Sequence, residues 1–145
     1  MDLCMQMSSI QALVHVSTAY CNCDKPDAHE VIYPPDEELQ KFMNDCQKSA
    51  PEDLTGTTKG LFGHPNTYTL SKSMAEFLLI EERGHLPVVI VRPSTITASL
   101  REPLPLGLGL FPSLLATRKL RADIVPVDIV ANTLICAAWH TATTR

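Results

Sequence analysis

Ala12-Leu-Val-His-Val-Ser17 is the stretch of sequence that decides the fold. It is a short run of apolar, mostly β-branched residues that ends in a small polar residue, which is typical of a buried strand in a parallel sheet. Leu86-Pro-Val-Val-Ile-Val91 has the same character and stops at Arg92-Pro93. The sequence therefore predicts two core strands of one sheet.

Helical patterns lie between and after these two runs. The clearest begins at Asn66, a favoured N-cap, and ends at Gly84, with apolar residues at helical spacing: Leu70, Met74, Phe77 and Leu78. Weaker patterns predict helices over 36–48, 114–120 and 128–139, the last capped by Asp128, and a short strand at 124–125. Three stretches with Pro, Gly, Asn or Asp punctuation are expected to be loops, namely 22–35, 49–65 and 100–112.

The order of strand, helix, strand and helix predicts the α/β class with a parallel sheet. A doubly wound sheet has about five or six strands. These 145 residues hold only two convincing core strands, and the first begins near residue 12. We therefore expect one part of a doubly wound parallel sheet, with its first strands missing and a strand edge exposed.

Composition narrows the functional classes. A net charge of -4 argues against a nucleic-acid partner, which would need a basic patch. No run reaches the roughly 20 apolar residues of a membrane span, and the N-terminus lacks the basic region of a signal peptide. The five cysteines are expected to be thiols, and no Cys or His spacing suits a metal site.

Tyr68-Thr-Leu-Ser-Lys72 places a phenol and an ammonium group four residues apart on the clearest helix. At this spacing the two side chains share one face, and the ammonium group favours the phenolate. Such a pair can deliver a proton to a carbonyl oxygen while a hydride attacks the carbon. Lys72 can also hydrogen-bond the ribose of a nicotinamide cofactor. An ordinary surface pair on an amphipathic helix would show the same spacing.

Polar residues follow both predicted strands directly. Ser17 and Thr18 follow the first, and Pro93, Ser94 and Thr95 follow the second. Open α/β sheets bind ligands at the carboxyl ends of their strands, so a hydroxyl there can reach the oxygen that Tyr68 protonates. The alternatives are that the hydroxyls only cap a turn and that the proline only terminates a strand.

Several longer blocks of sequence stand in a fixed order. They are Val14-His-Val-Ser-Thr-Ala-Tyr-Cys-Asn-Cys-Asp24, Glu30-Val-Ile-Tyr-Pro-Pro35, His64-Pro-Asn-Thr-Tyr-Thr-Leu-Ser-Lys72, Leu86-Pro-Val-Val-Ile-Val-Arg-Pro-Ser94, Ile96-Thr-Ala-Ser99 and Glu102-Pro103. Ala122-Asp-Ile-Val-Pro-Val-Asp-Ile-Val130 and Ala137-Ala-Trp139 come later. Together these blocks resemble the fatty acyl-coenzyme A reductases of the male-sterility type, which are extended short-chain dehydrogenases, and are similar to the insect members.

The resemblance implies that residues 1–145 are a partial Rossmann-type NAD(P)-binding domain. The family reduces long-chain fatty acyl-coenzyme A to a primary alcohol, through an aldehyde, with NADPH. Tyr68 is then the proton donor, Lys72 its partner and Thr18 the third catalytic residue, with Ser17 as the fallback. The cofactor would contact Tyr68 and Lys72 as well as the following residues: Ser17, Pro93, Ser94 and Thr95.

Three departures from the family pattern give rise to rival interpretations. The Gly-rich phosphate loop is absent, residues 104–121 look shortened, and the C-terminal domain with its membrane-associated tail is missing. The resemblance places the enzyme at peroxisomal or endoplasmic-reticulum membranes, on the cytosolic side, through those missing parts. One rival is a truncated, non-catalytic product that does not bind NADPH. The other is a sugar-nucleotide epimerase or dehydratase, which shares the Thr, Tyr and Lys arrangement.

Overall fold

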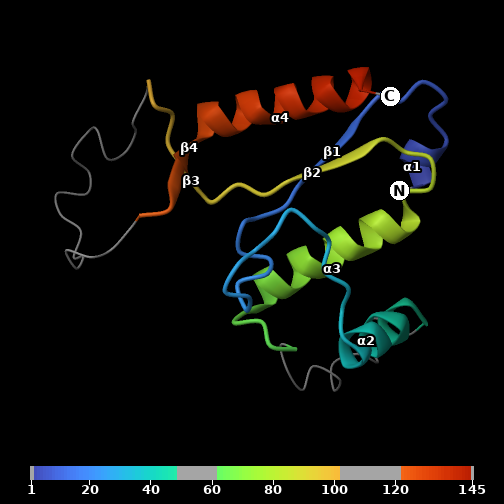
Figure 1. The fold of residues 1–145 in the computed structure, drawn as a ribbon. Coiled ribbons are helices and arrows are strands. Elements are labelled where there is room, and N and C mark those ends of the chain that lie inside the picture. Colours follow the sequence, from blue (N-terminus) through green and yellow to red (C-terminus); the bar gives the residue numbers. More distant parts are fainter. Residues whose placement is uncertain (1, 49–61, 102–121, 145) are drawn as a thin grey trace.

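The computed structural model describes residues 2–48, 62–101 and 122–144 (Figure 1). In chain order its elements are α1 (Asp2–Met5), β1 (Leu13–Val16), α2 (Glu37–Lys48), α3 (Thr67–Glu82), β2 (Val88–Val91), β3 (Thr95–Thr97), β4 (Ile124–Pro126) and α4 (Val127–Thr143). The helix expected at 114–120 lies outside the described residues, as do most of the loops expected at 49–65 and 100–112. Residues 22–35 have no helix or strand, as predicted.

The two predicted core strands pair in parallel, which confirms the α/β class. The register joins Leu13 to Val88 and continues to Val16 opposite Val91. Main-chain pairing continues past the strands, because the Ser17 amide donates to the Val91 carbonyl at 2.8 Å and the Ala19 amide to the Pro93 carbonyl at 2.9 Å. The residues that follow both strands are thereby brought side by side at one edge of the sheet.

The strands are less buried than the sequence predicts. Their residues are half-buried at most, and Val16 is 37% exposed. Figure 1 shows α4 on one side of the β1–β2 pair and α3 on the other, which is the layering of a doubly wound sheet. Within the described residues, however, β1 pairs only with β2. A two-stranded sheet leaves its outer edges uncovered, so apolar strand residues stay partly accessible.

Helix α3 begins and ends where the sequence predicts. The Asn66 side chain accepts a hydrogen bond from the Thr69 amide at 2.9 Å, which satisfies one of the free amides of the first turn. Gly84 follows the last turn with φ +53°, a left-handed conformation that favours glycine. Apolar residues of α3 pack against Leu39 and Met43 of α2 in a small core, as the periodicity indicated.

A second parallel pair, β3 with β4, carries the start of α4. A short strand was expected at 124–125, where β4 lies. Strand β3 was not predicted, because Thr95-Ile-Thr97 is not an apolar run. The predicted capping role of Asp128 is wrong: the N-cap is Pro126, without a side-chain bond, and Asp128 lies inside the helix. Its carboxylate accepts hydrogen bonds from the Leu100 amide at 3.1 Å, the Ser99 hydroxyl at 3.2 Å and the adjacent Ile129 amide at 3.2 Å.

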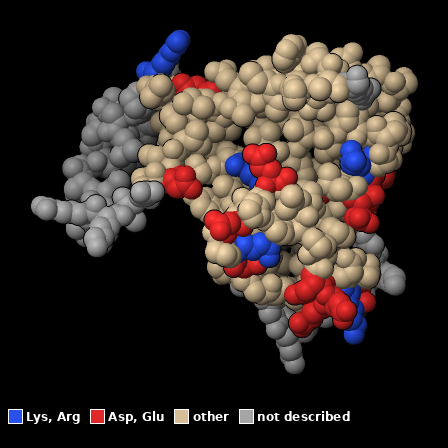
Figure 2. Space-filling model, in the orientation of Figure 1, with Lys and Arg blue, Asp and Glu red and all other residues tan. Residues whose placement is uncertain are grey.

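Helix α4 is the most apolar helix on the surface. On the face drawn in Figure 2, charged side chains gather below it, and the area over α4 carries hardly any. Its exposed residues include Ile135 and Trp139, each 68% exposed. No helix within the described ranges is both long enough and apolar enough to cross a membrane.

Candidate active site

A cavity of about 360 Å³ lies at the carboxyl ends of β1 and β2. The residues that line it are Ser17, Thr18, Tyr20, Tyr68, Pro93, Ser94, Thr95 and Ile96. All the site residues named from the sequence are in this list except Lys72. Segments distant in the chain converge here because the parallel register brings both strand ends to the same edge.

Lys72 lies immediately behind the cavity. Its Nζ donates a hydrogen bond to the Val16 carbonyl at 3.0 Å, at the last residue of β1. The same atom lies 6.0 Å from the centroid of the Tyr68 ring, one helical turn away, so the two side chains share a face of α3. An ammonium group has three donors, and the bond to Val16 uses one of them.

Tyr68 is in the first turn of α3, and its side chain is 53% exposed. Among the described residues no hydrogen-bond partner is found for its hydroxyl group. The phenol is therefore presented at the cavity with its O–H available to a ligand.

Thr18 and Ser17 are both 4% exposed, but their hydroxyl groups differ in surroundings. The Thr18 oxygen accepts a bond from the Tyr20 amide at 3.3 Å, which is the turn-capping contact that was considered as an alternative. That bond leaves the Thr18 O–H free to donate. Within the described part of the chain the Ser17 oxygen makes no hydrogen bond of standard geometry, yet it lies close enough to Glu76 to help lower the pKa of that carboxyl group. Both residues line the cavity, and the Thr18 O–H remains available there as a donor.

Tyr20 is a second phenol at the cavity, and the sequence analysis assigned it no role. Its hydroxyl lies 3.1 Å from the Thr95 hydroxyl and 3.4 Å from both the carbonyl and the carboxylate of Asp123. It therefore ties the end of β1 to the start of β3. A phenol four residues after a predicted strand could have indicated that Tyr20 lies at the cavity. Its contact with Asp123 could not be inferred, because the two residues are about a hundred positions apart in the sequence.

A buried ion pair between Glu76 and Arg92 lies beneath the cavity and was also missed. Arg92 Nη2 is 2.6 Å from Glu76 Oε2, and the Cys21 thiol donates to Glu76 Oε1 at 3.3 Å. Burial alone would raise the pKa of Glu76, but hydrogen bonds from Arg92, Ser17 and Cys21 outweigh it and lower the pKa. Burial, together with the Glu76 carboxylate, raises the pKa of Cys21 to about 11.

His15 is in β1 beside Lys72. Its Nε2 is buried and has no hydrogen-bond partner among the residues that the structure describes. Burial, and then the positive charge of Lys72, lowers the pKa of His15. The imidazole is therefore neutral at pH 7, and it adds no positive charge next to Lys72.

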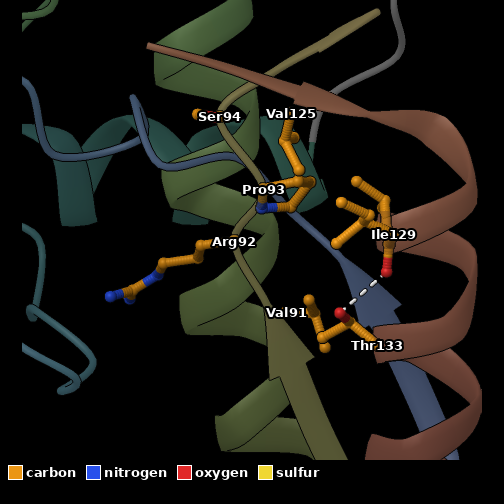
Figure 3. Close-up of a pocket in the computed structure, with 8 residues that line it drawn as sticks. Val91, Arg92, Pro93, Ser94, Val125, Ile129 and Thr133 are labelled. Atoms are coloured by element: carbon orange, nitrogen blue, oxygen red, sulfur yellow. Dashed lines mark hydrogen bonds between the residues drawn. The ribbon is translucent and has the colours of Figure 1, made fainter. Parts of the chain in front are cut away.

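An apolar cavity of about 190 Å³ adjoins the first and shares Pro93 and Ser94 with it. Figure 3 shows Val91, Val125 and Ile129 around this space, between β2, β4 and α4. Arg92 also borders the space, but its side chain points away from α4. A polar and an apolar cavity therefore meet at one wall.

Comparison with known proteins gives consistent matches along the chain. Residues 1–134 match the NAD-binding family described as male sterility protein. Fatty acyl-CoA reductase 1 of Xenopus laevis is 34% identical over 99% of this chain, and that of Rattus norvegicus is 35% identical over 99%. Fatty acyl-CoA reductase 2 of Mus musculus is 36% identical over 97%. The alignments cover 30–31% of the length of these relatives. No solved structure matches.

The lowered pKa of Glu76 makes the stability of the fold depend on pH. A carboxyl group with a depressed pKa stabilises the fold above its unfolded pKa, about 4.3, and loses this contribution as pH falls through the folded value. Glu76→Gln should therefore reduce the free energy of unfolding by about 2 kcal/mol near pH 7, because it leaves the partly buried Arg92 guanidinium without its charged partner. The difference from wild type should begin to shrink as pH falls below about 4.3, the unfolded pKa, and should disappear once the folded carboxyl group is also protonated.

Urea unfolding at several pH values measures this difference. Glu82→Gln, at the exposed end of α3, is the matched control and should change stability little at any pH. A Glu76→Gln effect that stays constant from pH 7 to pH 3 would contradict the assignment of an ionised pair.

Proposed function

The chain belongs to the male sterility family of fatty acyl-coenzyme A reductases, and from this we propose that residues 1–145 carry the proton-transfer part of an NADPH-dependent reductase active site. The proposed reaction converts a long-chain fatty acyl-coenzyme A to a primary alcohol through an aldehyde. One observation carries the proposal: Thr18 and Tyr68 line one cavity at the strand ends, with the Lys72 ammonium group directly behind.

The residues around the cavity fit the nicotinamide end of a dinucleotide. Lys72 has donors left for ribose hydroxyls after its bond to Val16. Pro93, Ser94 and Thr95 form a wall at the carboxyl end of β2, where open α/β sheets bind ligands. NADPH bound here would supply a hydride to the carbonyl carbon of the substrate.

The side chains would then supply the proton and stabilise the negative charge that develops on the carbonyl oxygen of the substrate. Tyr68 would donate its phenolic proton to the carbonyl oxygen as the carbon is reduced. Thr18 would donate a hydrogen bond to the same oxygen, since the Tyr20 amide occupies its oxygen and leaves its O–H free. The Lys72 ammonium group, 6.0 Å from the Tyr68 ring, would stabilise the phenolate left behind. In the first reduction the hydride and proton would give a hemithioacetal, whose hydroxyl proton is lost as the carbon–sulfur bond breaks and coenzyme A leaves as the thiol. A second NADPH and a second proton would then convert the aldehyde to the alcohol.

The adjoining apolar cavity favours an acyl substrate over a nucleotide sugar. Its walls include Val91, Val125 and Ile129, and it meets the polar cavity at Pro93 and Ser94. A methylene chain attached to a carbonyl in the polar cavity could enter it with favourable burial. A sugar ring would leave hydroxyl groups without partners there. Measuring the activity of the protein with palmitoyl-coenzyme A and with UDP-glucose in parallel decides between these two substrate classes.

Tyr68→Phe should remove most of the activity, because it deletes the proposed acid and leaves the ring in place. We expect the rate of NADPH oxidation with palmitoyl-coenzyme A to fall roughly 10²-fold or more. The assay uses the longest natural polypeptide that contains residues 1–145. Tyr20→Phe removes the other phenol at the cavity and should cost far less, since its hydroxyl already bonds Thr95 and Asp123. Similar losses in the two variants would contradict the role given to Tyr68.

Thr18→Val should lower kcat by roughly 10²-fold, because it removes one donor to the developing oxyanion and keeps the side-chain shape. Thr18→Ser retains the hydroxyl and should keep most of the activity. Ser17→Ala tests the alternative residue, and its effect should be smaller than that of Thr18→Val. The reverse order, with Ser17→Ala the more damaging, would transfer the role to Ser17.

Ile129→Trp should reduce activity on long acyl chains by filling the apolar cavity. We expect kcat/KM for palmitoyl-coenzyme A to fall about tenfold relative to that for butyryl-coenzyme A. Ile135→Trp introduces the same side chain on the same helix at a position that does not line this cavity, and it should leave the ratio unchanged. An unchanged ratio in Ile129→Trp would exclude this cavity as the acyl site.

A further inference from the structure

Helix α3 points three ionisable groups toward the sheet at intervals of one turn. Tyr68 and Lys72 serve the cavity, and Glu76 is the third. Glu76 is only 2% exposed, although it carries a carboxylate. A buried carboxylate is tolerated only when it is paired and hydrogen-bonded, so its partners define what it holds together.

Arg92 binds Glu76 through two parallel hydrogen bonds. Its Nε lies 2.9 Å from Oε1 and its Nη2 2.6 Å from Oε2, the bidentate geometry that fixes orientation as well as distance. The other guanidinium donors reach the carbonyls of His29 at 3.1 Å and Val31 at 2.9 Å. One side chain thus joins the end of β2, helix α3 and the 29–31 segment.

The other wall of the cavity is tied to the same carboxylate. Cys21 is fully buried, its thiol donates to Glu76 Oε1 at 3.3 Å, and its sulfur accepts a bond from the Asn22 side chain at 3.1 Å. Cys21 comes three residues after Thr18, and Arg92 directly precedes Pro93. The segments that carry Thr18 and Pro93 are therefore both anchored to the helix that carries Tyr68.

We propose that the buried Glu76–Arg92 pair positions the candidate active site, by holding the turn after β1 and the turn after β2 at a fixed distance from α3. Glu76 and Arg92 are positioning residues in this scheme, acting through Thr18, Tyr68 and Pro93. The effect on catalysis rests on the proposed reductase function. The mechanical part of the proposal, that the pair holds the two turns against α3, does not depend on that function.

Stability and positioning can be separated experimentally. Two apolar side chains of similar volume often replace a buried ion pair without loss of stability. They cannot hold the carbonyls of His29 and Val31 or the Cys21 thiol. A doubly apolar variant, Glu76→Leu with Arg92→Met, should therefore fold but lose the fixed geometry.

Cysteine alkylation, followed residue by residue with mass spectrometry, tests the mechanical part in the longest natural polypeptide that contains residues 1–145. Wild-type Cys21 should be protected, while Cys136, exposed on α4, gives the reference rate. Arg92→Lys keeps the charge but loses the bidentate geometry, and it should raise the Cys21 rate about tenfold or more by local opening. Lys25→Gln removes an exposed ion pair with Asp24 and should leave Cys21 protected.

Kinetics test the positioning part. Arg92→Lys and the doubly apolar variant should both lower kcat by about tenfold or more, as a displacement near 1 Å can, with KM for NADPH nearly unchanged. The doubly apolar variant should do so while melting close to wild type. Wild-type turnover in that variant, or Cys21 still protected in Arg92→Lys, would overturn the proposal. A wild-type protein without acyl-coenzyme A turnover would refute the proposed function alone, because the alkylation result still decides whether the pair holds the turns.

Discussion

The parallel pairing of β1 with β2 is the constraint on which the rest of the structure depends. Parallel strands begin at one edge of a sheet and end at the other, so Val16 and Val91 are opposite each other as their strands finish. The polar residues that follow must then share one crevice. An antiparallel pairing of the same two runs would place Thr18 and Pro93 at opposite edges. The cavity thus follows from strand direction before any side chain is considered.

Helix α3 adds the charged groups to this frame. Its period of 3.6 residues places Tyr68, Lys72 and Glu76 along one face. The three side chains differ in how far they are buried, and this decides which partners each can reach. Tyr68 is half-exposed at the mouth, Lys72 reaches the end of β1, and Glu76 is buried. Glu76 is neutralised by Arg92, and His15 stays neutral. Lys72 thereby keeps its positive charge 6.0 Å from the centroid of the phenol ring.

The sequence was sufficient for the parts that depend on local patterns. A few neighbouring residues are enough to predict the two strands, the Asn66 cap and the shared helix face of Tyr68 and Lys72. The structure confirms all three features. The catalytic roles remain predictions. Contacts between distant segments left no local signal, so the bonds of Glu76 to Arg92 and Tyr20 to Asp123 were missed. Asp128 was misassigned because its partners Ser99 and Leu100 compete with a capping role.

Pro93 and Ser94 form the wall that the two cavities share. Proline has no amide hydrogen, and its ring fixes φ, so it offers an apolar surface on a rigid backbone. The Pro93 carbonyl is meanwhile held by the Ala19 amide at 2.9 Å, which locks the wall to the turn that carries Thr18. Thr18 and Tyr68 therefore lie on one side of the wall, and Val125 and Ile129 on the other. A substrate with a carbonyl head and a hydrocarbon tail matches that division, because each part meets surroundings of its own polarity.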